Sequence, residues 1–162
     1  ETNPHDVSIY PDGHSLILIA DHQTMDLTQY GGKADANVTG VIIQELDANK
    51  DVIFEWSGWD HYAITDAVST VNLTSSMVDY IHPNALSRDN DDNILMSCRF
   101  LDEVSKISNE TGDFIWRLNG ENNQFTFIND PDSPKPFSHQ HHFRRLPNGH
   151  YTMFDNGNFQ SP

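Results

Sequence analysis

Residues 82–98 read HPNALSRDNDDNILMSC, and this stretch decides the fold class. A histidine opens a short apolar segment, a turn rich in Asp and Asn follows, and a second apolar segment returns at Ile94–Cys98. Asp and Asn tolerate the positive φ that tight hairpin turns require. The stretch therefore predicts a β-hairpin with a histidine at the start of its first strand.

The same pattern occurs twice more along the chain. His5 opens a segment that turns at Pro11-Asp12-Gly13 and returns as an apolar run. His141 opens another, which turns at Pro147-Asn148-Gly149 and returns through residues 151–154. A histidine thus holds the same position in three predicted hairpins.

Two further pairs of strand signals follow the first two hairpins. One pair is Val41–Leu46 with Val52–Trp56, and the other is Glu103–Ile107 with Asp113–Leu118. The first two units therefore contain four predicted strands each. Four-stranded meanders that repeat along a chain, without a long helical period between them, are typical of β-propeller blades. The sequence predicts an all-β protein of the β-propeller class with antiparallel strands.

The predicted blades span residues 5–60, 82–120 and 141–162, the third being incomplete. This repeat is longer than the roughly 40 to 50 residues of common propeller repeats, so we expect insertions at 20–40 and 119–138. Because propellers close with four or more blades, we expect two to three blades of a larger closed body. A β-sandwich with long loops is the alternative. It accounts for the strands but not for the recurring histidine.

Composition narrows the class of partner. Nine Lys and Arg residues stand against 24 Asp and Glu residues, which gives a formal charge of −15 over 162 residues. Such a surface repels nucleic acids and anionic lipids. No apolar run approaches the roughly 20 residues that span a bilayer, and we expect any export signal to lie upstream of Glu1. Cys98 is the only cysteine, so no internal disulfide is expected.

The first strand of each propeller blade lines the central channel, so residues at equivalent repeat positions converge there. His5, His82 and His141 are therefore expected around one axis. Arg99 lies one hairpin length beyond His82 and can reach the same end of the channel. Three imidazoles and a guanidinium all donate hydrogen bonds, which predicts an anion site. Imidazole is also a nucleophile near neutral pH. The ordinary alternative is that each histidine is a surface or strand-capping residue.

Metal binding is a second interpretation of the same histidines. Three histidines are the ligand set of some catalytic zinc sites, although a dication would repel Arg99. Residues 89–93 resemble the start of a calcium loop, but Ile94 and Phe100 stand where the loop needs Gly and Glu. We therefore interpret residues 89–93 as a hairpin turn. Phosphate-binding loops and hydrolase signatures are absent, and no cofactor or metal is predicted.

Eight short motifs lie in one order along nearly the whole chain. They are His5-Asp6, Pro11-Asp12-Gly13, WDHYAITD at 59–66, His82-Pro83-Asn84, Arg99 with Asp102, TGDFIW at 111–116, FSHQH at 137–141 and FDNG at 154–157. In this order the chain resembles the bacterial and fungal arylsulfotransferase family. Each motif alone is weak, and their shared order makes the resemblance specific.

The resemblance implies a six-bladed propeller with its active site in the central channel. It also implies ping-pong transfer of a sulfuryl group from an aryl sulfate ester to a phenolic acceptor, without a nucleotide sulfate donor, in a periplasmic or secreted protein. By this resemblance His141 is the nucleophile that becomes sulfated, with His139 and His142 as neighbouring alternatives. The other site residues implied are His5, His82 and Arg99 as catalytic groups, and Asn84, His61 and Gln140 as substrate-binding groups. The remaining alternatives are a propeller that binds ligands without chemistry and a zinc hydrolase or lyase.

Overall fold

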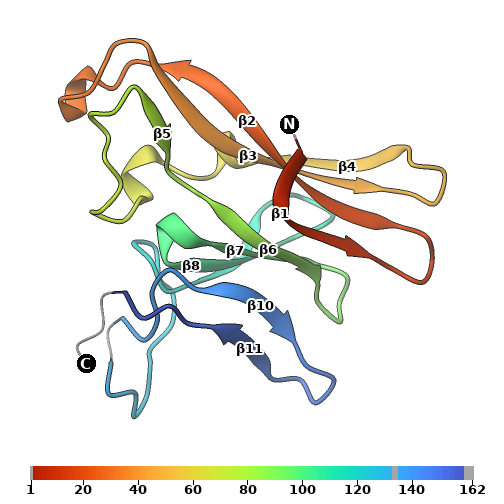
Figure 1. Cartoon of the computed structure of the whole chain (residues 1–162). Helices are drawn as coiled ribbons and strands as arrows, with labels where there is room; N and C mark the ends of the chain where they lie inside the picture. The colour runs from red at the N-terminus through yellow and green to blue at the C-terminus, as the bar shows by residue number, and fades with distance from the viewer. Residues whose placement is uncertain (1, 133–134, 159–162) are drawn as a thin grey trace.

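The protein is described by a computed structural model that covers residues 2–132 and 135–158. These residues form eleven strands in three sheets, with four short 3-10 helices and no α-helix among them (Figure 1). Within the same residues, no helix has the length and apolar character needed to cross a membrane. The predicted all-β class and the predominantly antiparallel pairing are confirmed.

The first sheet contains five strands. They are β1 (Thr2–Ile9), β2 (Ser15–Met25), β3 (Ala36–Leu46), β4 (Val52–Ser57) and β5 (Met77–Asp79). The first four follow one another as antiparallel neighbours, and β5 pairs in parallel with β3. Pairing of β2 with β3 continues without a break as far as Met25 and Ala36. Much of the insertion predicted at residues 20–40 therefore lengthens this hairpin.

The second sheet has four strands and the third sheet has two. They are β6 (Pro83–Arg88), β7 (Ile94–Cys98), β8 (Glu103–Ile107) and β9 (Phe114–Leu118), followed by β10 (His141–Arg145) and β11 (Tyr151–Phe154). All three predicted hairpins are present, as β1–β2, β6–β7 and β10–β11. Residues 89–93 form the predicted hairpin turn, closed by the Asp89 N–H donating to the Asn93 carbonyl at 2.7 Å.

The second sheet lies between the other two and packs against both (Figure 1). Every residue of β7 and β8 is buried. Side chains alternate between the two faces of a strand, so Ile94 and Met96 contact the core shared with the first sheet. Leu95 points the other way and packs with Phe143 of β10. The near-continuous apolar sequence of β7 follows from burial on both faces.

The first strands of the three sheets meet in the middle of the molecule (Figure 1). The Asp6 carboxylate on β1 accepts the Leu86 N–H of β6 at 2.6 Å. The same oxygen of Asp6 accepts a hydrogen bond from Arg144 of β10 at 2.7 Å. Ser8 donates to the Leu86 carbonyl at 2.7 Å. Polar side chains of β1 thus hold β6 and β10 beside it.

A buried ion network links the second sheet to the segment between β4 and β5. Arg117 donates from Nε and Nη2 to the two carboxylate oxygens of Glu103, each at 2.8 Å, and from Nη2 to Asp66 at 3.1 Å. The oxygen of Glu103 that accepts from Arg117 Nε also accepts from Ser105, which pairs with the Tyr62 hydroxyl. Burial raises the pKa of Glu103, and the hydrogen bonds and charge of Arg117 oppose that shift. The charge of Glu103 therefore depends on Arg117.

A second network links the second and third sheets. The Asp89 carboxylate accepts from Lys106 at 2.7 Å and from the Tyr151 hydroxyl at 2.6 Å, and it pairs with Arg145 at 3.0 Å. The hydrogen bonds from Lys106 and Tyr151 outweigh burial and lower the pKa of Asp89. Asp89, the first residue of the turn at 89–93, therefore holds the third sheet against the second.

Replacing Arg117 with Met leaves Glu103 buried without its cation. We expect a loss of about 3–5 kcal/mol in the free energy of unfolding, the range for removing one partner of a buried pair. Urea unfolding followed by tryptophan fluorescence measures this loss. Lys33→Met, which removes an exposed cation, is the matched control and should change stability by less than about 0.5 kcal/mol. Equal effects of the two substitutions would contradict the prediction.

Candidate active site

The structure brings the three repeat histidines together. The ring centroids of His5 and His82 lie 4.7 Å apart, edge to face. The pKa of His5 is lowered, first by desolvation of its ring and then by the charges of His82 and His141. His5 therefore favours its neutral form. The group forms where β1, the start of β6 and the start of β10 adjoin.

The Nδ1 atom of each of these imidazoles faces an oxygen atom. The pairs are His5 with Asn3 Oδ1 at 2.7 Å, His82 with Asp79 Oδ2 at 2.6 Å, and His141 with the His139 carbonyl at 2.9 Å. Carbonyl and carboxylate oxygens only accept hydrogen bonds, so Nδ1 is the donor in each pair. A neutral ring held in this way has its lone pair on Nε2, where it can act as a base or a nucleophile.

Arg99 supplies a cation to the same group. It begins the 3-10 helix η4 (Arg99–Leu101), and its backbone N–H donates to the His82 carbonyl at 2.9 Å. Its guanidinium lies over the ring of Phe100 at 4.6 Å. Among the arginines, all of which the structure describes, Arg99 is the one without a salt bridge to a described carboxylate. Its charge is therefore available to an anion.

Phe100 lies at the centre of these side chains. Its ring centroid is 4.8 Å from that of His82 and 6.0 Å from that of His139. His139 is buried, and the pKa of its imidazole is lowered by that burial and then by the charge of Arg99. Both effects favour the neutral form of His139.

The backbone is strained where the chain enters β6 and β10. His82, His139 and His142 have φ values of 50°, 53° and 54°, in the left-handed region that residues other than Gly seldom occupy. The pairing register shifts just after His82, between Pro83 and Ala85, and again within β10. Such strain persists only where the surroundings hold it, and it concentrates at functional sites.

Asn84 and Gln140 connect this group to the second sheet. Asn84 is buried and donates from Nδ2 to the Gln140 carbonyl at 2.8 Å, and Asn84 Oδ1 has no hydrogen-bond partner among the described residues. The amide of Gln140 is fully buried and donates to Ser97 Oγ and the Glu103 carbonyl, both at 3.0 Å. Gln140 therefore anchors the segment that carries His141, and its side-chain nitrogen is used within the protein.

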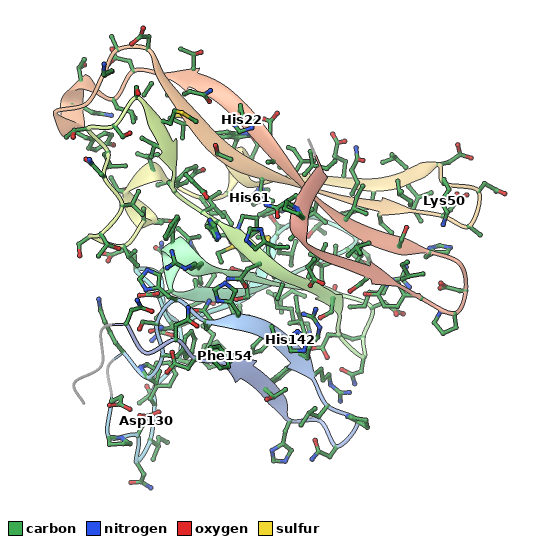
Figure 2. The ribbon with its side chains drawn as sticks, in the orientation of Figure 1. His22, Lys50, His61, Asp130, His142 and Phe154 are labelled. Atoms are coloured by element: carbon green, nitrogen blue, oxygen red, sulfur yellow. The ribbon has the colours of Figure 1, made fainter. Side chains whose placement is uncertain are left out.

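His61 belongs to a different cluster. Its ring stacks on Trp56 with the centroids 4.6 Å apart and meets Phe114 edge-on at 5.6 Å. Its Nδ1 bonds the Ser57 carbonyl at 2.9 Å. His61 thus packs beside β4 and β9, whereas His142 is an exposed residue of β10 (Figure 2). The structure does not bring His61 together with the three repeat histidines.

A pocket of about 240 Å³ adjoins the histidine group. It shares Asp79 and Phe100 with that group, and Val71, Met77 and Val78 are among its other walls. A larger pocket of about 450 Å³ is lined by Asp102 and other residues, and no histidine lines either pocket. Within residues 2–132 and 135–158, no three His, Cys, Asp or Glu side chains are grouped so as to hold a metal ion.

Sequence reasoning missed Asp79 and Phe100 and gave His139 only as an alternative nucleophile. Asp79 stands three residues before His82, a spacing that pairs side chains across a tight turn. Phe100 directly follows Arg99 and carried no signal of its own. The acceptor for His141 is a backbone carbonyl, which no sequence motif can mark.

One comparison with known protein families gives a match over nearly the whole chain. The family model for arylsulfotransferase (ASST) matches residues 2–161, nearly the whole chain. No curated protein matches it. Because this match covers nearly all of the sequence, the chain belongs to the arylsulfotransferase (ASST) family.

Proposed function

We propose that this protein transfers a sulfuryl group from an aryl sulfate ester to a phenolic acceptor through a covalent intermediate on His141. The observation that carries the proposal is the hydrogen bond from His141 Nδ1 to the His139 carbonyl. It leaves the Nε2 lone pair as the reactive atom, within a group that also contains His5, His82 and the unpaired Arg99.

The first half-reaction is an attack of His141 Nε2 on the sulfur of the aryl sulfate. The N–S bond forms, the S–O bond to the ring breaks, and the phenolate leaves with the electron pair of that bond. His82, whose Nδ1 lies 2.6 Å from Asp79 Oδ2, gives the phenolate its proton. The products are a phenol and a sulfated His141.

The second half-reaction reverses these roles. The oxygen of the acceptor phenol attacks the sulfur, the N–S bond breaks, and its electron pair returns to His141 Nε2. His82 takes the proton of the phenol. Both half-reactions develop charge on the sulfuryl oxygens, and hydrogen-bond donors fixed in advance around them lower the barrier. Arg99 is the permanent cation there, and Asn84 has a second Nδ2 hydrogen to donate. Neutral His5, whose hydrogen lies on Nδ1 and is bonded to Asn3, offers a lone pair and no donor at Nε2.

The pocket beside Phe100 suits the aryl part of the substrate. Its volume of about 240 Å³ is below the roughly 300–1,000 Å³ of pockets for drug-sized ligands, so it fits a single ring. Phe100 and Met77 offer apolar contact surface, and the pocket meets the histidine group at Asp79. A ring bound here would lie beside Asp79, the hydrogen-bond partner of His82.

We further infer that the three sheets are blades of a β-propeller, with β1, β6 and β10 facing its channel. Support comes from the contacts that Asp6 makes with Leu86 and Arg144, which bring the first strand of each sheet side by side. A periplasmic or secreted location, as in the resembling family, stays part of the proposal.

Replacing His141 with Asn should abolish both the covalent adduct and the release of phenol, because no lone pair of comparable nucleophilicity remains. The full-length protein is exposed briefly to a chromogenic aryl sulfate. Its intact mass is then measured, and the modified peptide is mapped. We expect the wild-type protein to gain one sulfuryl group, in the peptide that contains His141.

His142→Asn is the matched control for this experiment. It removes an exposed histidine one position away, at a φ of 54° that Asn tolerates, and it should keep the adduct and turnover. Full turnover by the His141→Asn protein would refute the assignment. A folded wild-type protein that forms no adduct and releases no phenol would favour a propeller that binds ligands without chemistry.

Replacing Phe100 with Leu tests the aryl pocket. The change keeps apolar bulk but removes the aromatic face, so we expect KM for aryl sulfates to rise about 2- to 10-fold, the equivalent of one aromatic contact. Steady-state kinetics measure KM and kcat. Phe154→Leu, at an exposed phenylalanine of β11, is the control and should leave KM unchanged. An unchanged KM in Phe100→Leu would exclude this pocket as the aryl site.

A further inference from the structure

We infer that Asp102 is a positioning residue for His141 and acts through the backbone of His139. Asp102 Oδ1 accepts the His139 N–H at 2.6 Å, and the His139 carbonyl accepts the His141 Nδ1–H at 2.9 Å. The inference rests on the proposed function of His141. It adds a residue that touches neither the sulfuryl group nor the phenol.

The carboxylate of Asp102 is well placed to fix a backbone conformation. Asp102 is 3% exposed, and its Oδ2 atom has no hydrogen-bond partner among the described residues. The bond to His139 is thus the one hydrogen bond that the structure gives this side chain within residues 2–132 and 135–158. A buried carboxylate with a single backbone donor indicates a dedicated contact.

The residue that Asp102 holds is strained. His139 has a φ of 53°, and the direction of its carbonyl depends on that conformation. If the bond to its N–H is lost, residue 139 is free to relax toward the negative φ that L-residues prefer. Its carbonyl then rotates away from His141. The contact with Asp102 therefore fixes the acceptor that His141 requires.

The acceptor decides which nitrogen of His141 is reactive. With the His139 carbonyl in place, Nδ1 carries the hydrogen and Nε2 carries the lone pair. Without it, the hydrogen can move to Nε2, and the nucleophile is lost in that tautomer. Arg99 begins the same helix η4 whose last turn Asp102 closes. The η4 turn thus supplies both the cation, Arg99, and the residue that positions His141, Asp102.

The first measurement is the tautomer of His141 by two-dimensional ¹⁵N–¹H NMR of the imidazole ring, in the full-length protein without substrate. We expect the wild-type ring to be the Nδ1–H tautomer. This readout needs no turnover, so it stays informative if His141 proves not to be the nucleophile. A wild-type His141 that carries its hydrogen on Nε2 overturns the inference before any variant is made.

The variants are Asp102→Gly and Asp102→Asn. Asp102 has a φ of 49°, which Gly and Asn both accept, so neither change adds backbone strain. In Asp102→Gly we expect the two tautomers to mix and the adduct to form about 10- to 100-fold more slowly, the range seen when the residue that orients a metal-binding histidine is removed. Asp102→Asn keeps an oxygen acceptor and should restore the single tautomer.

Asn119→Gly is the matched control. Asn119 also has a positive φ, of 61°, is 3% exposed, and bonds the same segment through the Phe137 carbonyl at 2.9 Å. Its side-chain nitrogen bonds residue 137 instead of residue 139, so this variant should keep the tautomer and the rate of the wild-type protein. If Asp102→Gly matches Asn119→Gly in both readouts, Asp102 has a structural role only and the inference is wrong.

Discussion

Asp6 holds together three strands that lie far apart in the sequence. Its carboxylate binds an N–H of β6 and the guanidinium of Arg144 on β10, and it directly follows His5. The same contact that aligns the three sheets therefore sets His5 beside His82 and brings the start of β10 to them. Hydrogen bonds to a charged group are stronger than neutral ones, which suits a contact with this role. Packing of the three sheets and geometry of the site depend on one another.

Charge is distributed unevenly over this protein. It carries a formal charge of −15, and four of its five arginines are neutralised by carboxylates. The fifth, Arg99, lies among histidines whose own protonation is disfavoured at His5 and His139. A permanent cation among neutral imidazoles can attract a sulfate ester while leaving a ring nitrogen unprotonated for attack. A site built only from protonated histidines would bind the anion but could not act as a nucleophile.

Much of the fold was predictable because the hairpins repeat. The turns at residues 11–13, 89–93 and 147–149 marked the strand pairs, and the histidine before each pair marked residues that meet in space. The parallel strand β5 was missed, because three residues have no period from which pairing can be read. With it Asp79 was missed, the partner of His82.

Other parts of the site depend on contacts between distant segments. His61 lies in a run of motif residues, yet its ring stacks on Trp56. Gln140 precedes the candidate nucleophile, yet its side-chain nitrogen donates to Ser97 and to the backbone of β8. Neither outcome follows from local sequence, because both are set by which sheet packs beside which.

Burial of the second sheet on both faces also affects how the chain acquires its structure. The ribosome releases β6–β9 before the β10–β11 hairpin that covers one of their faces. Leu95 and Val104 therefore stay exposed to water until Phe143 has been synthesised and can pack on them. The middle of this protein can reach its final packing only after synthesis has passed it, and nascent chains halted before β10 would present an adhesive apolar surface to chaperones.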